Sequence, residues 1–318
     1  MDKLATIIVG MNEWPQVIYT LRAVCEEFRD RSDFELIYVD NFPTVLDEWN
    51  KKRSPDQSYN VIKQSENLLP NFRVMEYRDH LSHWVCKKKA IQSSKADFFL
   101  FLDAHVLPGR DCLFNQYEYY RKHHKELNGS LHVPITYKIL ENHLLQYKMN
   151  NELNKGWLSY SFTSHRPGDG KPYPVSCHSM CGCIISRKVY EKFGGWPDMM
   201  ESWGGGENLF NFTLSILGMN KWLIPGRPLY HDGAPRGYSY NSNGLVKNRL
   251  IAMYMIGGDE LAHLFLINQK GDPSILKNVY HSILSNPEII AQRKHIESQQ
   301  VIDIHSWATQ WKDKWLPV

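Results

Sequence analysis

The sequence of 318 residues lacks both an excess of charge of one sign and an apolar leader. Its 37 lysines and arginines stand against 34 aspartates and glutamates, so the net charge of +3 gives no reason to expect a nucleic acid or an anionic membrane as partner. The first apolar run, LATIIVG, meets asparagine and glutamate within a few residues, unlike a signal peptide or a membrane anchor. We therefore expect a cytoplasmic protein with no transmembrane segment.

Cysteine is scarce as well, with six residues in the chain. The cluster CHSMCGC has no second group of cysteines or histidines at zinc-finger spacing, so reduced, mostly buried thiols are expected. The sequence also lacks internal repeats and low-complexity tracts. What it has is 42% hydrophobic residues, enough for the core of one large domain or two small ones.

One stretch departs from the even balance of charge. Residues 51–95 contain ten lysines and arginines against four aspartates and glutamates, including KKR at 51–53 and KKK at 87–89. A solvated face is the ordinary interpretation of such runs. The alternative is a surface that neutralises the phosphates of DNA.

Buried strands alternate with helices in the first hundred residues. Apolar runs over 4–10, 34–41 and 96–105 predict strands, and apolar residues at helical spacing over 14–30 and 83–94 predict helices. This alternation predicts an α/β fold with a parallel, doubly wound sheet, whose ligands collect at the carboxyl ends of the strands. Further on, residues 229–244 have too little apolar content to pack and predict a mobile loop, followed by helical segments.

The third of these strands ends in Asp103 and His105. Two residues apart on an extended segment, their side chains point the same way and can share one ion. A carboxylate with an imidazole suits Mn²⁺, which would stabilise a departing phosphate group. The alternative is an aspartate that caps the next turn beside a surface histidine. His231, which follows a later strand, is a candidate for a third ligand.

Two other stretches bring polar groups toward the same edge. The first two strands end in Asn12, Glu13 and Asp40, and the carboxylate of Asp40 can accept hydrogen bonds from a ribose or a uracil N–H. In ESWGGGEN, glycines allow the backbone close to a ligand and bring Trp203 and Glu207 beside it. Plain turns and a helix N-cap are the alternatives for both stretches.

The motifs together resemble a known family. TIIVGMNEW, YVDN, FLFLDAHV, CGCIISRKVYEKFGGWPDMMESWGGGEN and YHDGAPRGYSYNSNG, running into NRLIAMYMIGGDE, occur in the same order over roughly residues 5–260. They resemble nucleotide-sugar glycosyltransferases of the GT-A fold, most of all the catalytic domain of the polypeptide N-acetylgalactosaminyltransferases. The resemblance implies a Rossmann-like, mostly parallel sheet flanked by helices, a UDP-sugar donor, and Mn²⁺ or Mg²⁺.

The resemblance also implies roles for individual residues. The metal ligands would be Asp103, His105 and His231. The donor would contact Asn12, Glu13, Asp40, Trp203, Gly204, Gly205, Arg236 and Tyr238, and the catalytic residues would be Glu207 and Asn208. The catalytic domain would cover 1–260, with a nucleotide-binding half over 1–110 and an acceptor half over 111–260, before a helical extension over 261–318.

The departures from the family bear on the acceptor and the stereochemistry. WGGGEN has one glycine more than the family pattern, and Met11 replaces a histidine. We expect neither a secretory anchor nor a lectin domain, so a secreted polypeptide is not the expected acceptor. Hydroxymethylated bases of DNA are one alternative, and a lipid-linked glycan or polysaccharide is another. The alternative to an active enzyme is a catalytically inactive subunit that binds nucleotide sugars. A nucleotidyltransferase would need a basic, glycine-rich first loop, which VGMNEWPQ is not.

Asn208 follows Glu207 where inverting enzymes of this fold place a second carboxylate, and an asparagine cannot take a proton. We therefore expect transfer with retention. The competing interpretation makes Glu207 the base of an inverting reaction.

Overall fold

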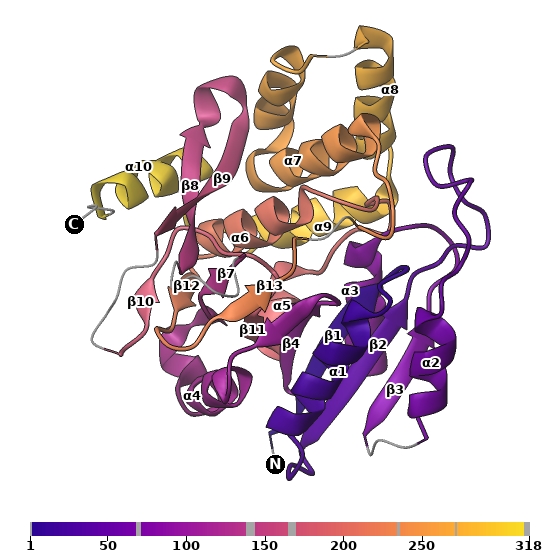
Figure 1. Cartoon of the computed structure of the whole chain (residues 1–318). Coiled ribbons are helices and arrows are strands. Elements are labelled where there is room, and N and C mark those ends of the chain that lie inside the picture. Colours follow the sequence, from indigo (N-terminus) through magenta and orange to yellow (C-terminus); the bar gives the residue numbers. More distant parts are fainter. Residues whose placement is uncertain are drawn as a thin grey trace.

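An eight-stranded, mostly parallel sheet forms the centre of the computed structural model, which describes residues 2–67, 71–137, 144–164, 170–233, 236–270 and 272–314 (Figure 1). The strand order is β10-β12-β6-β11-β4-β1-β2-β3. The strands are β1 (Leu4–Gly10), β2 (Phe34–Asp40), β3 (Phe72–Glu76), β4 (Phe98–Asp103), β6 (Gly129–His132), β10 (Tyr173–Pro174), β11 (Cys183–Ser186) and β12 (Asn220–Leu223). Strands β1 to β4 run parallel, and β11 is antiparallel to β4 and β6. The predicted doubly wound α/β sheet is confirmed.

Helices cover both faces of this sheet because alternate strand residues are apolar on both sides. Ile7 and Phe101 belong to one buried cluster, and Ile8 and Leu100 belong to the other. The first face is covered by α3 (His83–Ser93), α5 (Arg187–Phe193) and α6 (Gly206–Ile216). The second is covered by α1 (Gln16–Glu27), α2 (Ser58–Ser65) and α4 (Cys112–Leu127).

A second sheet of five strands lies beside the first, in the order β5-β13-β7-β8-β9. Its members are β5 (Val106–Pro108), β7 (Ile135–Thr136), β8 (Leu145–Glu152), β9 (Trp157–Ser164) and β13 (Leu229–His231), with a 3-10 turn, η1 (Leu153–Lys155), between β8 and β9. Strand β13 pairs antiparallel with β5, and the register sets His231 opposite Val106. This pairing carries His231 across more than a hundred residues of sequence to the end of β4.

The chain ends in helices, as expected: α7 (Ser242–Ile267), α8 (Pro273–Leu284), α9 (Pro287–Glu297) and α10 (Ile304–Lys314). Helix α7 crosses the predicted division at residue 260 and leaves helical geometry at Gly258, so the domain boundary stays a prediction. Within the described ranges, α7 is the one helix whose length and apolar composition would suit a membrane span. Half of its most apolar window is buried, as in core helices that pass the same test.

The lysines of KKK at 87–89 do not form a continuous basic face. Lys87 is 2% exposed, and its ammonium lies 5.1 Å from the ring centroid of Trp84. Lys88 forms ion pairs with Asp198, at 3.0 Å, and with Glu288. Two of the three lysines are therefore withdrawn from the surface that the DNA hypothesis assumed.

Candidate active site

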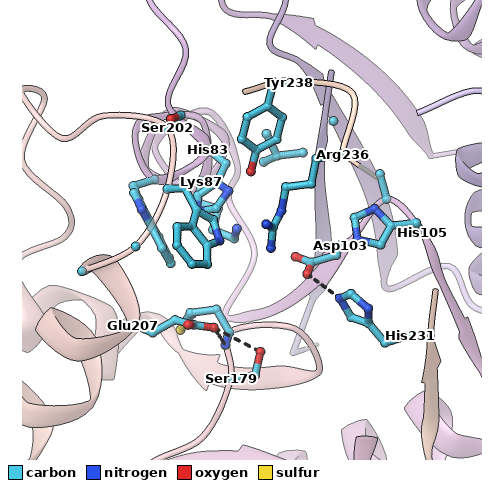
Figure 2. Close-up of a pocket in the computed structure, with 18 of the residues that line it drawn as sticks. His83, Lys87, Asp103, His105, Ser179, Ser202, Glu207, His231, Arg236 and Tyr238 are labelled. Carbon is cyan, nitrogen blue, oxygen red and sulfur yellow. Dashed lines mark hydrogen bonds and ion pairs between the residues drawn. The ribbon is translucent and has the colours of Figure 1, made fainter. Parts of the chain in front are cut away.

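A cavity of about 550 Å³ opens where β1, β2 and β4 end, as the sheet topology predicts. Its volume is in the usual range of small-molecule sites, about 300–1,000 Å³. Figure 2 shows side chains from both halves of the chain pointing into it. The predicted site residues that line the cavity are Glu13, Asp103, His105, Trp203, Gly204, Gly205, Glu207, Asn208, His231, Arg236 and Tyr238.

The three predicted metal ligands converge at one side of the cavity. One ligand atom each from Asp103, His105 and His231 lies within 4.8 Å of the others. The Nε2 atom of His231 is 3.2 Å from the Oδ2 atom of Asp103, and the two imidazole rings meet edge to face at 4.8 Å (Figure 2). One carboxylate oxygen and two imidazole nitrogens form a donor set that suits Mn²⁺.

A hydrogen bond at Nδ1 orients the ring of each histidine. The Nδ1 atom of His105 is 2.9 Å from a carboxylate oxygen of Glu13, and that of His231 is 3.0 Å from the backbone carbonyl oxygen of Asp232. An acceptor at Nδ1 favours the tautomer with its proton there, and Nε2 could then bind a metal, which in His231 would replace the contact of Nε2 with Asp103. The residues present therefore fit a divalent cation. Glu13 would orient the ligand His105 without contacting the metal itself.

The charge of Asp103 is stabilised by its neighbours. Burial disfavours the charged carboxylate, but the hydrogen bond and charge of His231, with the charges of Lys87 and His105, outweigh burial and hold the pKa of Asp103 well below its usual range. In His105 burial acts against the proton, while Glu13 and Asp103 favour it, so the pKa of His105 is raised. A charged carboxylate at Asp103 favours cation binding.

Glu207 lies at the opposite side of the cavity, in the first turn of α6. One carboxylate oxygen accepts hydrogen bonds from the hydroxyl of Ser179 and the N–H of Met180, both at 3.1 Å, and the other accepts from the hydroxyl of Tyr160. Burial raises the pKa of Glu207, and these donors offset part of the shift. Asn208 donates to the carbonyl of Leu158 at 2.8 Å. Neither carboxylate oxygen of Glu207 is free of protein contacts.

The loop before α6 owes its shape to its glycines. Gly204 and Gly205 have φ angles of 75° and 71°, which side chains on L-residues disfavour. A Cβ added at Gly206 would lie 2.3 Å from the ring of Trp84. The third glycine therefore accommodates an indole of the protein, where the sequence suggested close approach to a ligand.

Two predicted donor contacts do not line the cavity. Asp40 is 3% exposed and ion-paired with Arg78. The side chain of Asn12 accepts from the N–H of Asp56 at 2.9 Å and donates to the carbonyl of Ser54 at 3.0 Å. Their roles in nucleotide binding stay predictions, although both side chains are engaged within the protein.

Sequence reasoning missed two residues of α3 as part of the site. His83 and Lys87, four residues apart on one helix face, both line the cavity (Figure 2). The Nε2 atom of His83 is buried without a hydrogen-bond partner among the described residues. The spacing of four was visible in the sequence, but the lysine run around it indicated a solvated face.

The predicted mobile loop over 229–244 is described except for residues 234–235. Its segment 236–241 packs on Trp203, whose ring lies 4.9 Å from the guanidinium of Arg236 and 4.4 Å from the ring of Tyr240. Asn50, 1% exposed, holds the same segment by a pair of hydrogen bonds with the backbone of Ser239, at 2.8 and 2.9 Å. The segment 236–241 is thus held by Trp203 on one side and by Asn50 on the other.

We expect Asn50→Ala to loosen this segment. Two hydrogen bonds contribute together about 1–3 kcal/mol, so amide exchange over 236–241 should accelerate by about tenfold or more in the presence of UDP and Mn²⁺. Hydrogen exchange followed by mass spectrometry measures this. Asn60→Ala, at an exposed position of α2, is the matched control. Equal exchange rates in the two variants would show that Asn50 does not hold the segment.

Comparison with known proteins supplies a family. The model of the family described as "Glycosyl transferase family 2" matches residues 6–194. No functionally curated protein is similar enough in sequence to match.

Solved structures with the same fold are distant in sequence. The crystal structure of GalNAc-T7 with UDP, GalNAc and Mn²⁺ superposes with a TM-score of 0.62 at 15% identity, over 89% of this chain and 54% of that one. TarS of S. aureus in complex with UDP gives 0.53 at 12% identity, over 89% and 70%. The mannosyltransferase PcManGT of Pyrobaculum calidifontis with GDP-Man and Mn²⁺ gives 0.52 at 15% identity, over 98% and 79%. The chain spans about half the length of GalNAc-T7, and at these identities the likeness shows the fold, GT-A.

Proposed function

We propose, from the premise that this chain belongs to glycosyl transferase family 2, that it transfers a sugar from a UDP-sugar to a hydroxyl group of an acceptor with a divalent cation bound. Family membership makes the chain a glycosyltransferase, and the nucleotide, the cation and the acceptor are the proposed parts. The observation that carries the proposal is the convergence of Asp103, His105 and His231 in one cavity with Glu207.

Mn²⁺, or Mg²⁺ in its place, would be held by Asp103, His105 and His231 and would stabilise the negative charge of the leaving diphosphate. Lys87 and Arg236 line the same cavity and would supply positive charge for the phosphates. Trp203 and the segment 236–241 cover the donor and exclude water from it. Tyr238 lines the cavity beside Arg236 and belongs to the same cover (Figure 2).

Glu207 binds the transferred sugar. A carboxylate has about four lone-pair positions, and three of those in Glu207 accept from Tyr160, Ser179 and Met180. One sugar hydroxyl would occupy the last position, and no position would then remain for the proton of the acceptor. Because the next residue is Asn208, which cannot take a proton, this assignment favours retention over an inverting reaction with Glu207 as base.

The acceptor remains the open part of the proposal. Two lysines of the KKK run are engaged within the protein, so hydroxymethylated DNA loses part of the basic stretch 51–95 that suggested it. A screen with radiolabelled UDP-sugars should therefore compare simple glycosides, lipid-linked glycans and hydroxymethylated DNA side by side. Release of free sugar from the donor serves as the assay until an acceptor is found.

Removal of metal tests the core of the proposal. We expect UDP to bind at least about tenfold more weakly in EDTA than in MnCl₂, because the cation would link the diphosphate to Asp103. Sugar release from UDP-sugars should stop in EDTA and return with Mn²⁺. Isothermal titration calorimetry gives the affinities. The same UDP affinity in both buffers would contradict the proposed metal site, and Mn²⁺-dependent binding without any turnover would favour the inactive subunit.

A further inference from the structure

Arg249 is a cavity residue that the proposed chemistry leaves without a role. It lies in the first turns of α7 and lines the cavity, half-buried. Its guanidinium lies 5.0 Å from the ring centroid of Trp157. Among the described residues no carboxylate and no carbonyl oxygen pairs with it, whereas Lys247, two positions earlier, pairs with Glu201 at 3.2 Å.

The part of the surroundings of Arg249 that the structure describes contains hydroxyl groups and shows no paired counter-charge. Burial lowers the pKa of Arg249, and the neighbouring groups whose charge bears on it are the hydroxyls of Tyr160 and Tyr240. Tyr160 in turn donates to Glu207, which sets Arg249 on the sugar side of the cavity. An arginine that lines a cavity without a carboxylate partner keeps guanidinium donors available to an anionic ligand.

The phosphates of the donor have other cations. Lys87 and Arg236 are the cavity cations whose charge acts on Asp103 and on His105, respectively. Arg236 lies beside Asp103 in Figure 2, and Lys87 lies beside His83. A diphosphate bound there would leave Arg249 still unpaired.

We propose that Arg249 is an anion subsite that recognises a carboxylate or phosphate group carried by a sugar, either the sugar that is transferred or the sugar of the acceptor. The inference rests on the proposed function. The planar fork of a guanidinium binds such groups through two parallel hydrogen bonds, and the indole of Trp157 against its face fixes the plane of the fork. Trp157 and Tyr160 line the same cavity and add aromatic surface beside the guanidinium.

The test compares charged and neutral ligands of the same size on the whole chain. One arm titrates UDP-glucuronic acid and UDP-glucose in MnCl₂. The other titrates glucuronic acid, glucose 6-phosphate and glucose, with and without UDP. In one arm the charged ligand should bind the parent protein at least about tenfold more tightly than the neutral one, the scale of a charge-assisted hydrogen-bonded pair. The arm that responds tells whether the anion belongs to the donor or to the acceptor.

Variants assign the preference to Arg249. In Arg249→Ala the ratio of the affinity for the charged ligand to that for the neutral ligand should fall to about one, while the affinity for UDP itself is kept. Arg249→Lys should keep part of the preference for the charged ligand. Arg249→Gln, closer in length, serves if the alanine variant melts early. Lys247→Ala removes one charge from the same helix outside the cavity and should leave the ratio unchanged.

Two results would overturn the subsite. One is equal binding of charged and neutral ligands in both arms by the parent protein, and the other is a preference that survives Arg249→Ala and Arg249→Gln. Failure of the parent protein to bind UDP with Mn²⁺ would instead count against the proposed function. The arm with glucuronic acid and glucose, run without UDP, would still decide the role of Arg249.

Discussion

We expect Glu207→Gln to lower turnover by about two orders of magnitude or more while the affinity for UDP is kept. The substitution retains the shape of the side chain and removes a negative charge that faces the reacting sugar. In the proposed function the nucleotide is held on the other side of the cavity, by the metal and by the segment 236–241, so its binding should not depend on this charge. The expected loss therefore appears in kcat for release or transfer of sugar from a UDP-sugar.

The contacts of Glu207 indicate that the variant will fold. The amide oxygen of glutamine can take the place of the carboxylate oxygen that accepts from Ser179 and Met180. Its NH₂ group then faces the hydroxyl of Tyr160, which can rotate to accept instead of donating. Thermal unfolding of the variant checks this, and Glu201→Gln, in the preceding loop and outside the cavity, is the matched control.

The same experiment separates the two stereochemical routes. NMR of the product made by the parent protein gives the anomeric configuration, which should be that of the donor if Glu207 binds the sugar and takes no proton. Inversion would make Glu207 the base. Turnover near that of the parent protein in Glu207→Gln would rule out both roles.

The fold was predictable because its central strands are buried on both faces. Runs such as LATIIVG and FFLFLD leave no polar face, which indicates parallel strands covered by helices on both sides, and their carboxyl ends locate the site. Asp103 and His105 follow from the same pattern because they stand two residues apart beyond a strand. His231 joins them only through the pairing of β13 with β5, which local spacing does not encode.

What the sequence did not predict depends on contacts between distant segments. Lys87 belongs to a run of three lysines, and only the packing of α3 against the cavity separates it from Lys88, whose partners Asp198 and Glu288 lie far along the chain. Asp40 looked free at the end of a strand, but Arg78 pairs with it. Arg249 lies in an apolar helical stretch that gave no sign of a cavity.

The second large effect is expected from His231→Ala, which should weaken Mn²⁺ binding and Mn²⁺-dependent UDP binding together. Loss of a partner behind a metal ligand costs about 10–100-fold in affinity, and loss of a ligand should cost more. Coupling between two binding sites is reciprocal: bound UDP raises the affinity for Mn²⁺ by the same factor by which bound Mn²⁺ raises the affinity for UDP. In the variant, both factors should therefore fall equally. The affinity for UDP in EDTA should not change, because the imidazole would reach the nucleotide only through the metal.

A graded series makes this prediction specific. Glu13→Gln leaves all three ligands in place and weakens only the hydrogen bond that orients His105. Its affinity for Mn²⁺ should therefore lie between that of the parent protein and that of His231→Ala. His123→Ala changes a histidine on the surface of α4 and should have no effect. Electron paramagnetic resonance of free Mn²⁺ measures metal affinity without any turnover, and calorimetry measures UDP. If His231→Ala kept the Mn²⁺-dependent affinity for UDP, the joint site of Asp103, His105 and His231 would be wrong although the fold is right, because the pairing of β13 with β5 would then bring His231 to Asp103 for structural reasons alone.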